Sequence, residues 1–519
     1  MTTLRSHVRG QWVEPSGGFT PLVDPSTEEA IARTSTAGID FRETLDFARK
    51  TGGALLRGMT FAERAGVLDA MYKALYAARD DLIADSVRNT GTTRKDAKFD
   101  VDGATGVFKF YASLGAELGN RRVLADGEGG QLGRSPRFWG QHVRVPLDGA
   151  AVLINAFNFP LWGFAEKAAA AILAGVPVII KPATSTAYVT ARGFEHMVEA
   201  KAVPDGAASL LCGSSGDLLE ALGSQDVVAF TGSAATAMKI RSRENLLRSG
   251  TRINIEADSL NAAVLGPDVE PGSDTWKLFL QDVRREITQK TGQKCTAVRR
   301  VFVPADRADA AEHALAELLG ETVTGNPLDD SVTMGPLSTR DQLEDAVAGI
   351  RELLAESDLV LGSGERIDGV GAAAGKGFFF GPTLLRSRDS AAAQAVHHRE
   401  VFGPSATILP YDGAAAEAAR LVARADGCLV TSVYSDDEAF AADFLAGGGS
   451  YSGRLYLGSQ KMAEHAFGSG VALPQSLHGG PGRAGGGEEL GGLRALSLYM
   501  QRVALQGGRR MVQTLAGET

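Results

Sequence analysis

Short apolar segments alternate with alanine-rich helical segments through the middle of the chain. Apolar runs predict strands at 151–155, 177–181, 208–212 and 227–231, and the segments between them predict helices at 160–174, 184–201 and 215–223. Strands buried on both faces are apolar throughout, and strands joined by helices usually lie parallel. The alternation therefore predicts a parallel sheet covered by helices.

A second series of the same kind runs from about residue 258 to residue 473. Its predicted strands are 299–303, 359–361, 406–410 and 429–434. The first 125 residues carry amphipathic helical patterns, for example at 61–80, which suit the outer layer of a domain. Because 519 residues exceed one ordinary core, we predict an α/β protein with two Rossmann-like parallel-sheet domains.

Two segments fit neither series, and one apolar run is unusually long. The alternating pattern at 127–147 predicts a hairpin, and 496–505 predicts a lone strand. The longest apolar run, 168–180, contains Pro177 and is shorter than the roughly 18 residues of a membrane-spanning helix. It predicts a buried helix that turns into a buried strand.

Composition narrows the class of protein. The chain has 53 basic and 62 acidic residues, a net charge of −9, and no block of clustered Lys and Arg, which disfavours nucleic acid as a partner. Its N-terminus lacks the apolar core of a signal peptide. Three cysteines form no disulfide framework and no zinc-site spacing. We expect a cytoplasmic protein with no membrane association.

One cysteine lies in a setting that suits a nucleophile. Cys295 follows the small, polar sequence Thr-Gly-Gln-Lys, whereas Cys212 and Cys428 lie in apolar segments, where a thiol behaves as a small hydrophobe. Taken alone, Cys295 is more often buried filler. Glu256 and Asn158 strengthen the functional interpretation, because nucleophile, base and amide donor together supply acyl chemistry.

These residues, with Lys181-Pro182, Phe230-Thr-Gly-Ser233 and Glu400-Val-Phe-Gly-Pro404 in this order, resemble the aldehyde dehydrogenase superfamily along nearly the whole chain. The resemblance implies a cofactor-binding domain at 1–126 and 148–256 and a catalytic domain at 257–473. It also implies that 127–147 and 474–519 form an oligomerisation arm and C-terminal segment, and hence a homo-oligomer, most simply a dimer. The alternative for the arm is a hairpin that closes on its own domain.

The resemblance also assigns catalytic roles. Cys295 would attack the aldehyde, and Asn158 with the Cys295 N–H would hold the resulting oxyanion, although Asn158 is equally apt as a turn residue. Glu256 would activate the water that hydrolyses the thioester, and partial burial would raise its pKa toward neutrality. Lys167 and Glu489 would relay protons behind the thiol; a surface lysine and a helix-start carboxylate are the alternatives.

The implied cofactor is NADP rather than NAD. The cofactor-binding residues implied by the resemblance are Lys181, Thr184, Gly216, Thr231, Gly232, Ser233, Ala257, Glu400 and Phe402. NAD-preferring relatives often carry a glutamate where Thr184 stands, and its absence favours a 2′-phosphate. The segment 480–485 satisfies G-x-G-x-x-G, but no clear strand precedes it, so we reject it as a dinucleotide fingerprint. We also reject a metal site at His397-His398.

The segments 153–163, 256–261 and 478–492 are similar to a subgroup that oxidises semialdehydes carried on coenzyme A thioesters during aerobic breakdown of aromatic compounds. The resemblance thus implies a small-molecule aldehyde substrate, a CoA thioester. Three alternatives stay open: a different semialdehyde without CoA, a cysteine thioesterase or amidase, and a catalytically silent protein of the same fold.

Overall fold

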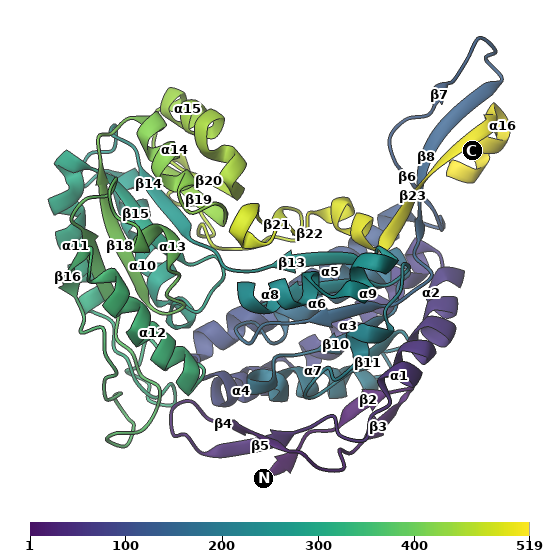
Figure 1. Cartoon of the computed structure of the whole chain (residues 1–519), viewed down its shortest axis with the longest axis horizontal. Helices are drawn as coiled ribbons and strands as arrows, with labels where there is room; N and C mark the ends of the chain where they lie inside the picture. The colour runs from purple at the N-terminus through teal and green to yellow at the C-terminus, as the bar shows by residue number, and fades with distance from the viewer. Residues whose placement is uncertain (518–519) are drawn as a thin grey trace.

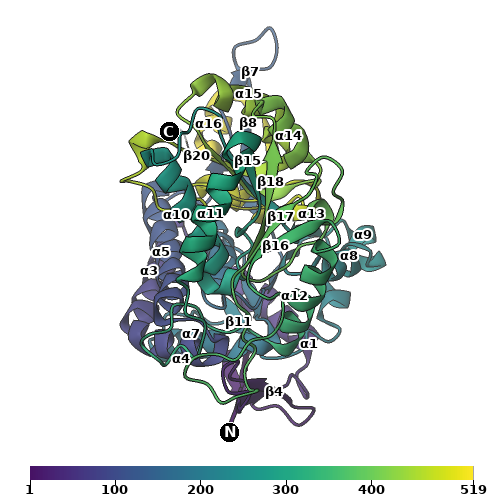
Figure 2. The same cartoon turned by 90° about the vertical axis from the view of Figure 1, so that its left-hand side faces the viewer.

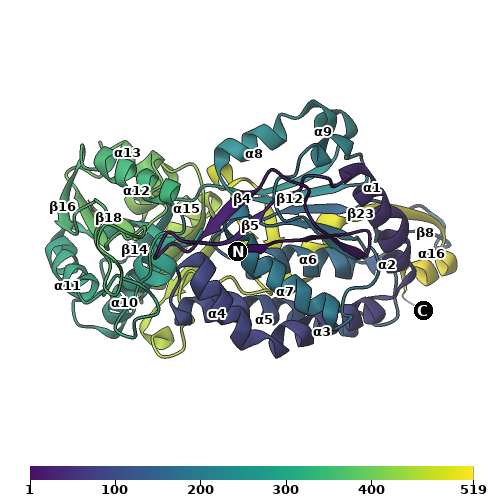
Figure 3. The ribbon, with the colours of Figure 1, turned by 90° about the horizontal axis from the view of Figure 1, so that it is seen from below.

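The computed structural model describes residues 1–517, which form two lobes, each built on a seven-stranded sheet (Figures 1 and 3). The first sheet contains, in order, β13 (Arg252–Glu256), β12 (Val227–Thr231), β9 (Ala151–Ile154), β10 (Val178–Lys181), β11 (Ala208–Leu210), β2 (Ser6–Val8) and β3 (Gln11–Val13). The first five strands are parallel, and β2 and β3 are antiparallel additions at the edge.

Helices cover both faces of this sheet, which explains why its strands are apolar throughout. Leu153 faces one core and Val152 the other, because successive side chains of a strand point to opposite faces. The first core contains residues of α3 (Phe61–Ala77), α5 (Arg94–Leu118), α6 (Trp162–Ala174) and α7 (Ala187–Glu199). The second contains residues of α1 (Phe41–Phe47), α8 (Ala234–Arg241) and α9 (Glu244–Ser249).

The second lobe, which faces the viewer in Figure 2, repeats this architecture. Its strand order is β16 (Ser357–Leu361), β17 (Thr383–Ser387), β18 (Ser405–Tyr411), β15 (Val298–Pro304), β14 (Asn261–Leu265), β19 (Cys428–Tyr434) and β20 (Ser452–Gly458). Only β16 is antiparallel to its neighbour. One core includes α10 (Asp274–Thr288) and α11 (Ala308–Gly320), and the other includes α12 (Arg340–Leu353), α14 (Ala415–Ala423) and α15 (Glu438–Gly448).

The fold prediction is confirmed, with errors in single elements. All eight strands of the two predicted series are present. The helix predicted at 215–223 is wrong, since only a 3-10 turn at Leu218–Ala221 forms there. The second series also lacks β14, β17 and β20; β20 begins with Ser-Gly-Arg, which is not typical of a strand.

The long apolar run forms a buried helix and a buried strand, as predicted. Helix α6 ends at Gly175, which has φ 96°, and β10 follows after Pro177. A left-handed residue closes the helix and proline cannot extend it. Within residues 1–517, no helix has the length and apolar character needed to span a bilayer.

A small sheet projects from the first lobe at the upper right of Figure 1. In it, β8 (Phe138–Pro146) pairs antiparallel with β23 (Met500–Gly508) along its whole length, and with β6 (Leu124–Ala125) and β7 (Gly130–Gln131). The predicted hairpin is thus confirmed. The predicted C-terminal strand begins later, because 492–499 form 3-10 turns, and the helix α16 (Arg509–Ala516) follows it.

The strand order of the first sheet fixes where a ligand can bind. Strand β9 lies between β10 on one side and β12 on the other, so the chain reverses its direction across the sheet there. Parallel α/β sheets bind ligands outside the carboxyl ends of strands at such a switch point. The residues that follow β9, β12 and β13 therefore surround a crevice.

Candidate active site

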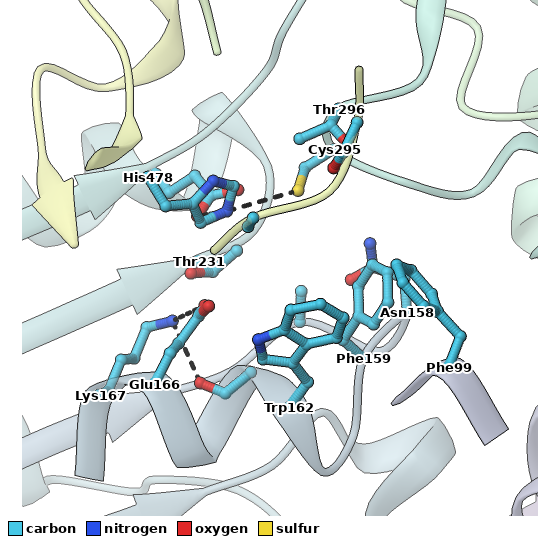
Figure 4. A pocket seen from close by; sticks show the side chains of 15 residues that line it. Phe99, Asn158, Phe159, Trp162, Glu166, Lys167, Thr231, Cys295, Thr296 and His478 are labelled. Carbon is cyan, nitrogen blue, oxygen red and sulfur yellow. Dashed lines mark hydrogen bonds and ion pairs between the residues drawn. The ribbon is translucent and has the colours of Figure 1, made fainter. Parts of the chain in front are cut away.

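Two cavities meet at Cys295. A large cleft of about 2010 Å³, including space open to solvent, lies along the carboxyl ends of the first sheet. A smaller pocket of about 490 Å³ lies on the other side of the thiol (Figure 4). Five residues line both cavities: Ala156, Asn158, Thr231, Glu256 and Cys295. The structure thus brings the predicted nucleophile, base and amide donor together at this junction.

The loop before Cys295 has a strained backbone. Lys290 and Thr291 have φ of 53° and 57°, although left-handed conformations cost a non-glycine residue about 1–3 kcal/mol. Gly292 is also left-handed, and a Cβ there would lie 2.2 Å from the Gly403 carbonyl oxygen. A side chain at 292 therefore cannot be accommodated without moving the loop.

Buried polar contacts hold this loop in place. Asn261 donates to the Cys295 carbonyl oxygen at 2.8 Å, and the Thr296 hydroxyl donates to the Gly470 carbonyl oxygen at 2.9 Å. Lys294 forms a buried ion pair of 2.9 Å with Glu286. Such contacts fix the direction of the thiol before any substrate arrives.

The three cysteines differ in their surroundings. Cys212 and Cys428 are buried, as the sequence predicts, and Cys295 is partly exposed. Burial of its sulfur, with the negative charges of Glu256 and Glu166, raises the pKa of Cys295 well above its ordinary value. The thiol therefore needs a proton acceptor close by to become a nucleophile.

Glu256 ends β13 and points at an imidazole. Its Oε2 lies 3.2 Å from Nε2 of His478. Burial raises the pKa of Glu256, but His478 and Lys167 outweigh burial and lower the pKa to about 2. The predicted rise toward neutrality is therefore wrong for this arrangement, because the sequence showed the burial and not the cationic neighbours.

Behind Glu256, Lys167 pairs with two carboxylates. Its Nζ lies 2.9 Å from Glu489 and 3.3 Å from Glu166, and Asn254 donates to Glu489 at 3.2 Å. Burial raises the pKa of Glu489 to about 8, against the opposing charge of Lys167. Lys167 is buried and Glu489 lies in the strand β22 (Glu488–Leu490), so neither a surface lysine nor a helix-start carboxylate describes them.

Most of the predicted cofactor residues line the large cleft. Those that line it are Lys181, Thr184, Thr231, Gly232, Ser233, Ala257, Glu400 and Phe402. Gly216 does not line it. It has φ 47° in the loop after β11, and a Cβ there would lie 2.4 Å from the ring of Phe41. Close packing against Phe41 therefore explains why residue 216 is a glycine.

The strand-to-helix turn at the predicted phosphate position contains an additional carboxylate. Ser233 caps α8 by accepting from Thr236 N, as the turn chemistry predicts. Asp258 accepts a hydrogen bond from Ala234 N at 3.1 Å, and its other oxygen lies 3.8 Å from Arg483. Asp258 and Arg483 both line the cleft, although no motif in the sequence indicates either of them.

Arg483 lies in the glycine-rich segment 480–485, whose G-x-G-x-x-G spacing the sequence does not support as a dinucleotide fingerprint. A three-residue strand, β21 (Leu477–Gly479), does precede this segment, contrary to prediction. The segment itself contains one 3-10 turn, Gly482–Ala484, and begins no helix. It therefore lacks the helix N-terminus that a dinucleotide fingerprint requires.

Glu400 and Phe402 lie at the side of the cleft that belongs to the second lobe. Ser259 N donates to Glu400 at 3.2 Å, and Arg299 lies 3.9 Å away. Burial raises the pKa of Glu400 to about 7, although Arg299 lowers it. Phe402 makes an edge-to-face contact with Phe157, with centroids 5.8 Å apart.

Aromatic rings form the wall of the smaller pocket (Figure 4). Phe99, Phe159 and Trp162 pack edge to face, with ring centroids 5.0–6.0 Å apart. Sequence spacing gives no sign of this cluster, because Phe99 comes from α5 and the other two rings from the segment that leads into α6. The paired histidines do not line this pocket: buried His397 contacts Arg300 and the Ser390 carbonyl oxygen, whereas exposed His398 lines the large cleft.

Comparisons with known proteins match nearly the whole chain to one family. The model of the Aldehyde dehydrogenase family matches residues 12–500. A 3,4-dehydroadipyl-CoA semialdehyde dehydrogenase of Aromatoleum evansii is 44% identical over 478 residues, which cover 92% of this chain and 93% of the relative. A non-phosphorylating aspartate-semialdehyde dehydrogenase of Halomonas elongata is 27% identical over 78% of each chain.

Solved structures show the same fold. Betaine aldehyde dehydrogenase of Staphylococcus aureus in complex with NAD⁺ superposes with a TM-score of 0.83, at 23% identity, over 97% of this chain and 95% of that chain. An NAD-dependent aldehyde dehydrogenase of Sinorhizobium meliloti gives a TM-score of 0.84 at 22% identity, over 98% of this chain and 95% of that chain.

Proposed function

The chain belongs to the aldehyde dehydrogenase family, and from this premise we propose that it oxidises 3,4-dehydroadipyl-CoA semialdehyde to the carboxylic acid with NADP. The observation that carries the proposal is the thiol at the junction of two cavities. One cavity offers an apolar channel for the aldehyde, and the other has the size and strand-end position of a dinucleotide site. The CoA-linked substrate is supported by the 44% identical relative.

The cleft fits a nicotinamide dinucleotide. Lys181 and Thr184 at the end of β10 would hold the adenine ribose, and Glu400 beside Phe402 would hold the nicotinamide ribose. When bound, the nicotinamide accepts a hydride. The carboxylate of Asp258 would repel a pyrophosphate at the start of α8, and Arg483, 3.8 Å from that carboxylate, would offset its charge.

Cys295 supplies the nucleophile of the first half-reaction. Its sulfur bonds to the aldehyde carbon, and the carbonyl oxygen becomes an alkoxide. Asn158, which lines both cavities, and the Cys295 N–H would donate to that oxygen. Donors fixed before the reaction stabilise the developing charge without reorganisation. Loss of hydride from the same carbon leaves a thioester on Cys295.

Glu256 acts in the second half-reaction. It would accept a proton from the water that attacks the thioester, and cleavage of the C–S bond releases the acid and the thiolate. The buried Lys167–Glu489 pair lies directly behind Glu256, and Glu489, with its raised pKa, can hold that proton in turn. The chain thus provides a route for protons away from the thioester.

NADP is proposed over NAD because Thr184 places no negative charge beside the adenine ribose. A carboxylate there would repel a 2′-phosphate. A cysteine thioesterase or amidase is disfavoured, since hydrolysis alone does not require a large second cleft that contains Lys181 and Glu400. Steady-state kinetics with both cofactors and with simple aliphatic aldehydes would test the cofactor preference and the CoA-linked substrate.

Replacing the proposed base separates the two half-reactions. Glu256→Gln should give one burst of NADPH, equal to the concentration of active sites, followed by turnover slower by about 100-fold or more, because acylation is retained and hydrolysis lost. Rapid-mixing absorbance at 340 nm and the mass of the acylated enzyme are the measurements. Cys295→Ser is the control and should give no burst. A wild-type enzyme that produces acid without NADPH would contradict the proposal.

A further inference from the structure

A two-stranded ribbon brings His478 to the thiol. Strands β21 and β22 pair antiparallel, with His478 directly opposite Glu489. Directly opposite residues of an antiparallel pair lie on the same face, so the ribbon presents an imidazole and a carboxylate side by side. His478 is buried, and Figure 4 shows its ring turned toward Cys295.

One nitrogen of this ring faces both proposed catalytic groups. Nε2 of His478 lies 3.8 Å from Sγ of Cys295 and 3.2 Å from Oε2 of Glu256. Its Nδ1 is buried and has no hydrogen-bond partner among residues 1–517. We propose that His478 is a catalytic residue that accepts the thiol proton of Cys295, with Glu256 holding the resulting imidazolium beside the thiolate.

The proton transfer is balanced within the three residues. The S–H bond breaks, its electron pair stays on sulfur, and the proton joins the lone pair of Nε2. The charge that appears on the imidazole lies between the thiolate and the carboxylate of Glu256. Pairing with an imidazolium is how a cysteine becomes a thiolate at neutral pH in other cysteine enzymes.

The charges that surround the imidazole support this transfer. Burial lowers the pKa of His478, but the nearby carboxylates outweigh burial and raise it. The charged and titratable groups that face it are Glu256, Glu166, Cys295 and Arg454. Burial and the charge of Glu256 raise the pKa of the Cys295 thiol, by contrast, so loss of its proton needs an acceptor in contact with the sulfur.

The proton on His478 also decides when Glu256 can act as a base, so that hydrolysis follows acylation. This part of the inference rests on the proposed function. While His478 is protonated, Glu256 is held in an ion pair and is a weak base. Bonding of the sulfur to the aldehyde carbon moves the negative charge from sulfur to oxygen, and loss of hydride removes it, so in the thioester the imidazolium has lost one of its two anionic partners. Release of its proton to water then frees Glu256 to accept a proton from the hydrolytic water.

Alkylation of Cys295 by iodoacetamide tests the pair without aldehyde or cofactor. The wild-type rate should follow a thiolate that titrates below about pH 7, as in other His-paired cysteines. In His478→Gln and His478→Phe, the titration should move to about pH 8.5 or above, with a rate at pH 7 lower by about 15-fold or more. His313→Gln, which changes an exposed histidine on α11, is the matched control.

A second measurement needs no histidine variant. The absorbance of wild type minus Cys295→Ser at 240 nm reports the thiolate directly and should be present at pH 7. The inference would be overturned if this thiolate absorbance were absent at pH 7. It would also be overturned if folded His478→Gln had the same alkylation profile as the wild type. If the wild-type protein gave the expected alkylation profile but did not reduce NADP with aldehyde, the proposed function would be wrong and the role of His478 would still hold.

Discussion

Single carboxylates in this site are tuned by what surrounds them. The side chains of Glu256 and Glu400 are only 2% and 12% exposed, yet the pKa of Glu256 is lowered to about 2 and that of Glu400 is raised to about 7. His478 lies 3.2 Å from Glu256, whereas the nearest cation to Glu400 is 3.9 Å away. The distance of the nearest cationic side chain therefore decides whether the pKa of the carboxyl rises or falls. Burial alone raises that pKa, and the cation must offset this rise.

Glu400 should give the protein a pH-dependent stability. The unfolded carboxyl ionises near 4.5 and the folded one near 7, so the folded state binds more protons between these values. Stability contributed by Glu400 therefore falls as pH rises from about 4.5 to 7, by about 3 kcal/mol, and is constant above pH 7. Melting temperatures across pH 4.5–8 measure this fall.

Glu400→Gln should flatten that part of the profile, because an amide does not ionise. The exposed Glu344→Gln serves as the control and should follow wild type. Glu489 contributes in the same direction but is unchanged in both variants. Parallel profiles for wild type and Glu400→Gln would show that folding does not raise the pKa of Glu400.

At the scale of elements, the packing of α5 on α6 shapes the aromatic pocket. A Cβ at Gly103 of α5 would lie 1.9 Å from the indole of Trp162, which is part of the pocket wall. A Cβ at Gly115 of the same helix would lie 2.5 Å from Leu173. These glycines cost helix propensity but allow the two helices to approach closely.

Gly103→Ala should destabilise the protein by about 1–3 kcal/mol, since the methyl group displaces the indole in a packed core. It should also raise KM for the aldehyde, because the displaced ring narrows the pocket. Gly106→Ala on the same helix is the matched control: nothing lies within 4 Å of its Cβ, so it should stabilise by about 0.5–1 kcal/mol. Thermal unfolding and steady-state kinetics measure both effects. Equal behaviour of the two variants would contradict this packing.

At the scale of the whole molecule, the projecting sheet leaves a strand edge unpaired. β23 is the terminal strand of that sheet and is largely exposed along its length. A long, exposed edge is a template for a further strand. The second lobe also ends in an edge strand, β20, on which Leu457 is exposed. These features support the proposed homodimer, in which the arm of one subunit reaches the sheet of the other.

Light scattering should give a mass twice the 54.4 kDa of the chain. Val503→Asp with Leu505→Asp places two charges on one face of β23 and should shift the mass toward that of the monomer. Gln506→Glu, on the other face of the strand, should leave the mass unchanged. A monomeric wild-type protein would refute the dimer.

The sequence by itself determined the two α/β series, the arm hairpin and most of the cleft residues. Continuous apolar runs and turn residues are local properties, and motifs such as Phe230–Ser233 belong to one strand-to-helix turn. The helix predicted at 215–223 from its composition is wrong. Gly216 there has a left-handed backbone and packs on Phe41, so the segment forms a loop and a 3-10 turn.

Only the tertiary structure decided the contacts made over long sequence distances. Cys295 and His478 are 183 residues apart, and Glu256 lies 222 positions before His478. These three residues come together because of the register of the β21–β22 pair, which lies between the two lobes (Figure 1). The same holds for Asp258 beside Arg483 and for the three rings of the aromatic pocket. Electrostatic and steric effects act between atoms a few ångströms apart in space. The periodicity of a sequence does not indicate which residues, distant along the chain, come that close.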